Sequence, residues 1–188
     1  MIDIVFPDKN EEEFVQMAKR LGISGLIFAY KNKADFYNGK EPNIANALLV
    51  EPKNIQKARA INAPAICLAS REAIERGADI VYGFELQEAK EHTHYRASGL
   101  NQVLCKLATD KKARIGFSFS IISAYTGQKR AVLLGRLMQN IIFCRKYKTP
   151  MKIASFATEP YEMRAPAELT AFFQQLGMQQ SEIQSALK

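Results

Sequence analysis

The sequence predicts an α/β fold in which helices cover parallel strands. Short, almost continuous apolar runs alternate with segments whose apolar residues recur at helical spacing. Runs that are apolar throughout are typical of parallel strands buried on both faces, and their alternation with helices is typical of such sheets. The 188 residues, 47% of them hydrophobic, are enough for one sizeable core. We therefore expect a single domain spanning residues 1–188.

Five of the expected strands lie in the first half of the chain. They are residues 2–6, 25–29, 44–50, 65–69 and 79–82. Asn10 or Asp8 can cap the first helix, which ends at Gly22, because a side-chain oxygen can accept a bond from an unpaired amide. Pro52 is suited to the start of the next helix, and Ser70 can cap a short one after the fourth strand.

The stretch from His92 to Ser120 predicts a loop, a helix and a buried strand. Ser98 is suited to cap the helix, and residues 113–119 form the apolar run of the strand. The apolar face of the helix is predicted to comprise Leu100, Val103, Leu104, Leu107 and Ala108. The loop lies ahead of a helix N-terminus, where backbone amides favour an anion. A capped helix behind an ordinary solvated loop is the alternative.

The last third of the chain predicts a long helix, a strand and two further helices. The long helix covers 128–148, and the seventh strand covers 151–157. Pro166 begins a helix that ends at Gly177, and Ser181 is suited to cap a final short helix. Side chains expected inside are Leu134, Leu137, Met138, Ile141 and Ile142 of the long helix, then Leu169, Phe172, Phe173 and Leu176. Periodicity does not distinguish an open sheet from a closed barrel.

Positive charge is concentrated in the second half. The net charge is +7, but residues 1–90 carry 12 Lys and Arg against 13 Asp and Glu, whereas residues 91–188 carry 14 against 6. Between His92 and Lys152 there are 12 basic residues and one acid, Asp110. Such segregation costs self-repulsion unless a polyanion is bound, and it is typical of nucleic-acid-binding proteins. Charge that serves solubility alone is the alternative, although solubility needs no clustering.

Several segments resemble the barrel protein subunit of ribonuclease P in its archaeal form. HYRASGLNQVLCKLA (94–108), followed by IGFSFS (115–120), is similar to that family's signature. Three later stretches agree in order: RLMQNIIFCRKYK (136–148), MKIASFAT (151–158), and MRAPAEL (163–169) leading into LGM (176–178). The resemblance covers most of the chain and is strongest from about residue 79 onward. The family, called the thirty-kilodalton subunit in eukaryotes, is related to the polymerase-and-histidinol-phosphatase barrels.

The resemblance implies a compact TIM-like α/β barrel of about seven parallel strands. Such a barrel would be smaller than the usual eight-stranded barrel, which has about 250 residues. It also implies a non-catalytic subunit of a holoenzyme, the endoribonuclease that removes the 5′ leader from precursor tRNA. The RNA subunit, with Mg²⁺, would cleave the precursor tRNA, and this chain would bind no cofactor. Expected partners are ribonuclease P RNA, a small ferredoxin-like protein subunit in a heterodimer or heterotetramer, other ribonuclease P proteins, and precursor tRNA.

Basic residues are the predicted RNA contacts, because arginine suits bidentate phosphate contacts and lysine a looser charge contact. Cations at the start of the long helix oppose its macrodipole and so indicate another role, whereas those at its end are partly explained by helix chemistry. Tyrosines interleaved with these charges can stack on bases. The predicted RNA-binding residues are His94, Arg96, Lys129, Arg130, Arg145, Lys146, Lys148 and Arg164.

A metal-dependent phosphoesterase of the polymerase-and-histidinol-phosphatase type is the alternative function. The chain has only two histidines, His92 and His94, and the first strand ends in Phe6-Pro7-Asp8 without the His-x-His of those enzymes. A hydrolytic site with several metals needs more ligands, so we expect neither a catalytic residue nor a metal site. Ser118 and Ser120 are expected to be structural, and Glu85 and Glu88 after the fifth strand are weak catalytic candidates.

Cysteine usage and the N-terminus indicate a cytoplasmic protein without a membrane span. Cys67, Cys105 and Cys144 lie in apolar runs and are expected to be buried, reduced thiols. The first residues have neither a basic start nor a long apolar region, so we expect no signal peptide.

Overall fold

Seven parallel strands form a nearly closed TIM-like barrel. The structure is a computed structural model that describes residues 1–39, 41, 43–87 and 97–188. Each strand pairs in parallel with the next one along the chain. The strands are β1 (Ile2–Val5), β2 (Gly25–Tyr30), β3 (Ile44–Leu49), β4 (Ala65–Leu68), β5 (Ile80–Tyr82), β6 (Arg114–Ser118) and β7 (Met151–Ala154). The predicted α/β class and the seven parallel strands are confirmed.

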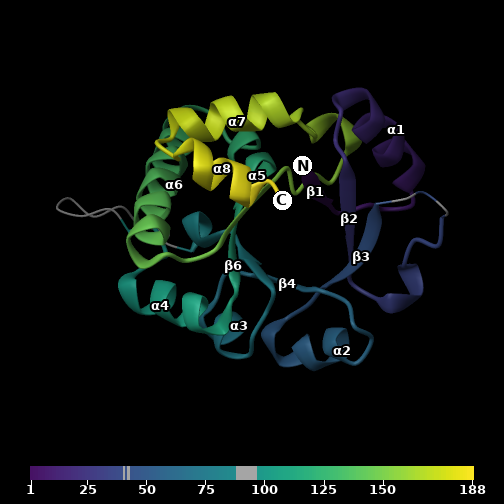
Figure 1. Ribbon diagram of the computed structural model, residues 1–188, viewed down its shortest axis with the longest axis horizontal. Coiled ribbons are helices and arrows are strands. Elements are labelled where there is room, and N and C mark those ends of the chain that lie inside the picture. Colours follow the sequence, from purple (N-terminus) through teal and green to yellow (C-terminus); the bar gives the residue numbers. More distant parts are fainter. Residues whose placement is uncertain (40, 42, 88–96) are drawn as a thin grey trace.

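Helices cover the outside of the strands (Figure 1). They are α1 (Glu11–Leu21), α2 (Ile55–Arg59), α3 (Arg71–Glu75), α4 (Gln102–Lys111), α5 (Phe119–Ser123), α6 (Gly127–Tyr147), α7 (Pro166–Gln175) and α8 (Gln180–Ala186). Short 3-10 turns are η1 (Lys33–Asp35), η2 (Pro52–Asn54), η3 (Phe84–Leu86) and η4 (Pro160–Glu162). Among the described residues, no helix is long and apolar enough to cross a membrane.

The first and last strands meet through a side chain more than through a hydrogen-bond ladder. One isolated parallel bridge joins Val5 to Ala157. Nearby, the fully buried Asp3 carboxylate accepts bonds from Ser155 N and Ser155 Oγ, each 2.6 Å long. Because these donors lie on the β7 side of the seam, a carboxylate of β1 supplies much of the bonding that closes the barrel.

Lys152 of β7 reinforces the same seam. Its Nζ donates to the backbone oxygen of Ile2 over 2.7 Å, and only 1% of the residue is exposed. Burial lowers the pKa of Lys152 to about 8, against the opposing effect of the Asp3 charge. Burial also raises the pKa of Asp3, although its bonds from Ser155 act in the other direction. The seam therefore holds two titratable side chains away from water.

The barrel interior is apolar and ends in an aromatic cluster. Tyr82 and Phe156 stack with ring centroids 4.6 Å apart, and Phe6 lies 5.8 Å and 6.0 Å from them. The remaining buried interior residues are Ile4, Ala29, Ala47, Ile66, Ile80 and Ala154. A larger core lies between the sheet and its helices and contains all three cysteines, which are buried free thiols as predicted.

Ser98 does not cap a helix, contrary to the prediction. The cap of α4 is Asn101, whose Oδ1 accepts from Leu104 N over 3.0 Å. Ser98 is instead buried, and its backbone oxygen accepts from Asn140 Nδ2 over 3.0 Å. Gly99 follows with φ +80°, and a Cβ there would collide with the backbone oxygen of Phe84. Tight packing of this segment moves the helix start three residues further on.

Three apolar residues predicted inside are exposed. Val103 of α4 is 53% exposed, and Met138 and Ile142 of α6 are 42% and 59% exposed. In both helices, the row of buried apolar side chains is narrower than the spacing of apolar residues in the sequence predicted. Of the predicted α6 set, Leu137 and Ile141 are fully buried and Leu134 packs against the core as a partly buried residue.

Three element ends also differ from the prediction. The seventh strand, predicted to end at residue 157, ends at Ala154. The sixth strand stops at Ser118, because its hydroxyl accepts from Ile121 N over 3.2 Å and begins α5. The last helix begins after Gln179, whose backbone N–H donates to the Glu182 carboxylate over 2.7 Å. Ser181 therefore lies inside α8 and does not cap it.

Asn10 stands at the cap position of α1, but its side chain accepts from Asp8 N instead of a helix amide.

Replacing Asp3 by alanine is expected to lower the free energy of unfolding by about 3 kcal/mol, because it leaves buried donors of Ser155 and Ile4 unpaired. Urea denaturation measures this. Asp110→Ala, at an exposed carboxylate of α4, is the control and should change stability little. Equal stability of both variants would show that the seam is held by other contacts.

Candidate nucleic-acid interface

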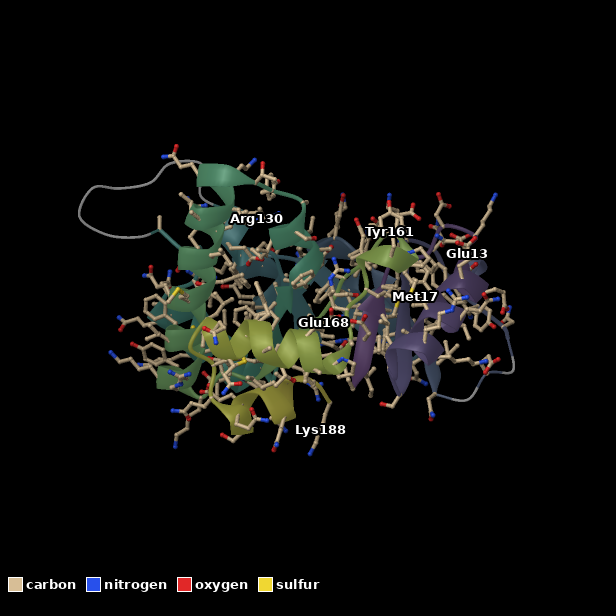
Figure 2. The ribbon with its side chains drawn as sticks, turned by 90° about the horizontal axis from the view of Figure 1, so that it is seen from above. Glu13, Met17, Arg130, Tyr161, Glu168 and Lys188 are labelled. Atoms are coloured by element: carbon tan, nitrogen blue, oxygen red, sulfur yellow. The ribbon has the colours of Figure 1, made fainter. Side chains whose placement is uncertain are left out.

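Five of the eight predicted RNA contacts lie in two groups at the ends of α6, and Arg164 lies apart from them, just before α7. Lys129 and Arg130 lie in its first turn, and Arg145, Lys146 and Lys148 lie at its end. Figure 2 shows Arg130 at the start of this helix. A helix of 21 residues places its two ends about 30 Å apart. His94 and Arg96, like His92 and Glu88, lie outside the described residues.

At the start of α6, lysine and arginine have different surroundings. Lys129 is exposed, and its Nζ lies 3.9 Å from the centre of the Tyr125 ring. Arg130 is half-buried and donates to the backbone oxygens of Ser123, over 3.0 Å, and Tyr125. These oxygens lie at the end of α5, where a cation is favourable. Arg130 therefore joins two helices, whereas the Lys129 charge faces solvent.

Arg145 and Arg164 are also engaged within the fold. Arg145 makes a two-pronged ion pair with Glu182 of α8, with both N–O distances 2.7 Å, and donates to Gly177 O over 2.6 Å. This pairing lowers the pKa of Glu182 and raises that of Arg145. Arg164 donates to the backbone oxygens of Tyr161 and Met163. Of these two predicted contacts, Arg145 has its charge already neutralised.

Lys146 and Lys148 belong to a larger cluster of exposed cations, which we call the helix-end patch. It lies where α4 and α6 end, and it continues onto the start of β6. Its members are Lys106, Lys111, Lys112, Arg114, Lys146 and Lys148. Within the described part of the chain, none of the six forms an ion pair. The sequence had suggested only two of them, because the other four lie about 40 residues earlier in the chain.

Contacts between the two helix ends bring this patch together. Thr109 Oγ1 donates to Tyr147 O over 3.2 Å, and Thr149 Oγ1 donates to Cys105 O over 3.1 Å. The ammonium groups of Lys106 and Lys146 lie 6.0 Å and 5.7 Å from the centre of the Tyr147 ring, one from each helix. Tyr147 therefore stands between cations of α4 and α6.

Two lysines of the helix-end patch occupy strained backbone positions. Lys112 ends α4 with φ 58°, and Lys148 ends α6 with φ 53°. Glycine or asparagine usually fills this left-handed position, and another residue there costs about 1 kcal/mol or more. A cation near a helix end recovers about 0.3–1 kcal/mol of that cost. The charge therefore offsets much of the cost of the left-handed backbone.

The opposite face, at the carboxyl ends of the strands, has an aromatic mouth. A cavity of about 880 Å³ is lined there by Phe6, Tyr82 and Phe156 among others. Ser120 Oγ donates to Phe156 O over 2.8 Å, and Ser118 caps α5. Among the described residues there is no group of three or more His, Cys, Asp or Glu that could hold a metal.

Glu85 lies in η3 after β5 and is 1% exposed. Its Oε1 and the Oδ1 of Asn140 are buried without a hydrogen-bond partner in the described part of the protein. Arg136 of α6 donates to the backbone oxygen of Glu85 over 2.9 Å. Burial raises the pKa of Glu85 to about 7. Because Glu85 does not line the mouth cavity, its position fits packing under α6 better than catalysis.

Comparison with known proteins yields one consistent set of relatives. No model of a known protein family matches the chain. Ribonuclease P protein component 3 of Methanosarcina mazei is 26% identical over 189 residues, covering 94% of this chain and 78% of the relative. The protein of the same name from Methanosarcina acetivorans is 33% identical over 92 residues, covering 49% of this chain and 38% of the relative.

Solved structures share the fold. A chain in the cryo-EM structure of archaeal ribonuclease P with mature tRNA superposes with a TM-score of 0.73 at 19% identity, covering 95% of this chain and 83% of that one. A prolidase complexed with N-methylphosphonate-L-proline gives a TM-score of 0.57 at 9% identity, covering 98% of this chain and 71% of that one. Identities this low establish shared architecture only.

The barrel and its relatives point to one class, the barrel proteins of ribonuclease P, which this chain resembles. Within that class the chain is similar to ribonuclease P protein component 3 along most of its length. The resemblance read from the sequence is thereby confirmed.

Replacing Glu85 by glutamine tests its burial through the pH dependence of stability. A folded-state pKa of about 7, above the ordinary 4.5, means that the folded state keeps a proton which the unfolded state releases. Glu85 therefore lowers the wild-type free energy of unfolding by about 3 kcal/mol as pH rises from 4.5 through 7. Glu85→Gln should gain stability relative to wild type by about that amount over this window.

Urea unfolding at pH 4.5 to 8 measures the difference between the two proteins. Glu13→Gln, at an exposed carboxylate of α1, is the matched control and should show no such trend. A flat difference for Glu85→Gln would mean that the carboxyl group has the same pKa in the folded and unfolded states.

Proposed function

We propose that this chain is a non-catalytic protein subunit of the ribonuclease P ribonucleoprotein, which removes the 5′ leader from precursor tRNA. The observation that carries the proposal is the helix-end patch, six exposed cations without carboxylate partners in the described residues, on a barrel similar to ribonuclease P protein component 3. In this division of labour the RNA subunit performs hydrolysis with Mg²⁺, and this chain binds no cofactor.

The physical role of the chain is to neutralise closely spaced phosphates. Lysine and arginine at a nucleic-acid surface release condensed counterions, so they stabilise the folded RNA at a lower Mg²⁺ concentration. Lys129, Lys146 and Lys148 are the predicted contacts whose charges face solvent. Arg130, Arg145 and Arg164 act mainly by fixing the helices that carry them. His94 and Arg96 remain predicted contacts.

The phosphoesterase alternative finds less support in the geometry. Barrel enzymes place catalytic groups at the carboxyl ends of the strands. Here Phe6, Tyr82 and Phe156 lie at that end. The Ser118 hydroxyl accepts a hydrogen bond from Ile121 N, and the Ser120 hydroxyl donates one to Phe156 O. A bound stoichiometric metal that is released on replacing His92 and His94 would restore the alternative.

A ribonucleoprotein subunit also needs protein partners. The small ferredoxin-like subunit expected from the resemblance would require an apolar surface in addition to charge. Val103, Met138 and Ile142 provide exposed apolar side chains on the outer faces of α4 and α6. We infer that the assembly is cytoplasmic, where precursor tRNA would be its substrate, and that no membrane is involved.

A reconstituted cleavage assay tests the proposal. It combines the cognate ribonuclease P RNA and the small protein subunit at low Mg²⁺, with and without this chain. We expect cleavage at the mature 5′ end only when the chain is present. Equal cleavage in both mixtures, together with no binding of RNA by the chain, would refute the proposal.

The strained lysines allow a sharper test of the helix-end patch. Lys112→Gly with Lys148→Gly relieves two left-handed residues, so the variant should be more stable than wild type by about 1 kcal/mol. The same variant should bind ribonuclease P RNA more weakly. Its salt slope should fall by about 0.9 for each phosphate that the protein no longer neutralises, as measured by filter binding over a range of salt concentrations.

Lys19→Ala with Arg20→Ala is the control for charge, because both cations are exposed, lie on α1 and are outside the patch. This variant removes the same number of charges, and it should leave the salt slope unchanged. An unchanged slope in the Lys112 and Lys148 variant would show that the patch does not contact RNA.

A further inference from the structure

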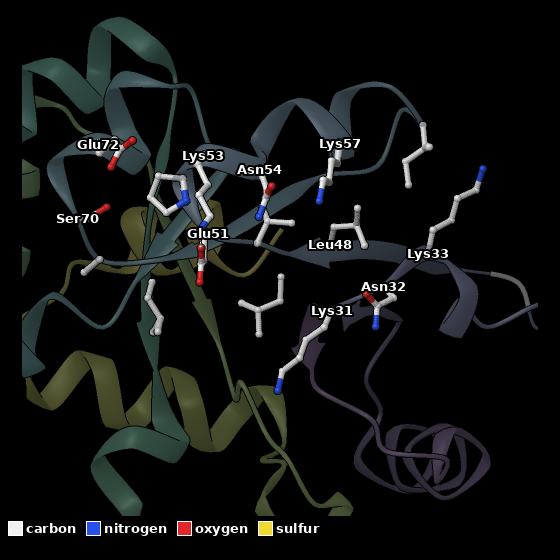
Figure 3. A pocket seen from close by; sticks show the side chains of 16 residues that line it. Lys31, Asn32, Lys33, Leu48, Glu51, Lys53, Asn54, Lys57, Ser70 and Glu72 are labelled. Carbon is white, nitrogen blue, oxygen red and sulfur yellow. Dashed lines mark ion pairs between the residues drawn. The ribbon is translucent and has the colours of Figure 1, made fainter.

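A groove at the carboxyl ends of β2, β3 and β4 gathers basic residues from the half of the chain that has almost no net charge. Its cavity of about 950 Å³ is lined by Lys31 and Lys33 after β2, and by Lys57 of α2. Figure 3 shows Lys57 on the α2 side of the groove and Lys31 and Lys33 on the β2 side. All three residues are exposed.

The charge balance of the groove favours an anion. Its two carboxylates are already paired, Glu51 with Lys53 and Glu72 with Arg76, each over 2.7 Å. Lys31, Lys33 and Lys57 have no ion pair or side-chain hydrogen bond within the described part of the chain. Three lysine charges therefore remain to attract a ligand.

The floor of the groove is apolar. Leu68, the last residue of β4, is 60% exposed, the most exposed of the large aliphatic side chains in the described structure. The half-buried side chains of Leu49 and Val50 lie beside it in the groove lining. Duplex RNA presents phosphates at its surface and keeps its bases stacked inside, so it offers nothing to cover Leu68. An unpaired strand offers both phosphates and base faces.

The groove also continues into the mouth of the barrel. Both cavities are lined by Lys31, Asn32, Leu49 and Leu68. The charges change sign along this path, because the mouth carries four carboxylates, those of Asp8, Glu11, Asp35 and Glu159, against the ammonium groups of Lys9 and Lys31. An acidic peptide is negative along its length and would be repelled there. A nucleotide is negative only at its phosphate, and its base carries amino donors that carboxylates accept.

We propose that this groove binds an unpaired segment of RNA, with phosphates at Lys31, Lys33 and Lys57 and a base over Leu68 toward the barrel mouth. The inference rests on the proposed function for the identity of the RNA. The groove itself predicts that the bound RNA is single-stranded. It adds a contact surface that the clustering of charge in the sequence does not indicate.

The test compares two triple variants with equal loss of charge. Lys31→Ala, Lys33→Ala and Lys57→Ala remove the groove cations, whereas Lys19→Ala, Arg20→Ala and Lys188→Ala remove exposed cations elsewhere. Fluorescence anisotropy measures binding of a short unstructured RNA and of a fully paired, blunt-ended duplex RNA. The groove variant should bind the unstructured RNA about tenfold more weakly than the control, with a salt slope lower by about 0.7 for each phosphate left without a lysine. Both variants should bind the duplex equally.

Leu68→Ser separates the apolar floor from charge. Because Leu68 is largely exposed, the substitution leaves the core intact. It should weaken binding of the unstructured RNA about threefold with an unchanged salt slope. Equal binding of the unstructured RNA by both triple variants would overturn the inference. Displacement of a labelled glutamate- and leucine-rich peptide from the groove, without RNA binding there, would also overturn it and identify a peptide site.

The cleavage assay keeps the two proposals distinguishable. If cleavage depends on the chain and on the helix-end patch but binding is insensitive to the groove, the groove inference fails and the subunit function stands. If the groove variant no longer binds unstructured RNA while the chain has no effect on cleavage, the groove inference stands and the subunit function fails.

Discussion

The barrel depends on how its first strand meets its last. The other neighbouring strands share parallel ladders, whereas β1 and β7 share one bridge and the Asp3 carboxylate. A carboxylate that accepts several short bonds can replace a ladder, because each bond in a dry site is costly to lose. Sealing the seam in this way fixes the positions of the strand ends. Those ends in turn position the helix-end patch on one face and the lysine groove on the other.

The two faces of the barrel divide its chemistry. Where the strands begin, the ends of α4 and α6 present lysines and one arginine around Tyr147. Where the strands end, aromatic rings close the interior, and carboxylates and lysines surround the opening. Phe6, Tyr82 and Phe156 pack together at that second face, and the carboxylates and lysines lie around them.

The sequence predicted the fold well because parallel strands that are buried on both sides are apolar throughout, and this pattern is local. The prediction was less accurate where contacts between residues far apart in the chain determine the local structure. Ser98 is a good cap by type, but Asn140, 42 residues away, binds its backbone oxygen and draws it into the core. Met138 and Ile142 match a helical stripe, yet α6 lies against the barrel at an angle that buries Leu137 and Ile141.

The same limit applies to the candidate site. Composition correctly located the excess of positive charge, but it did not reveal which cations are neutralised. Glu182 pairs with Arg145 across 37 residues, and that pairing is visible only in three dimensions. The groove at Lys31, Lys33 and Lys57 was missed because its surrounding sequence is balanced in charge.

In the proposed function, the length of α6 affects how tightly the RNA is held. Lys129 near its start and Lys146 near its end are carried on one rigid helix, about 25 Å apart along its axis. Once one end of the helix is seated, the other is held at a high effective concentration near a fixed point on the RNA, provided that the spacing of the RNA matches. Two individually weak contacts then act as one strong contact. An RNA folded to the wrong spacing would gain only one of them, so the helix can act as a gauge of correct RNA folding.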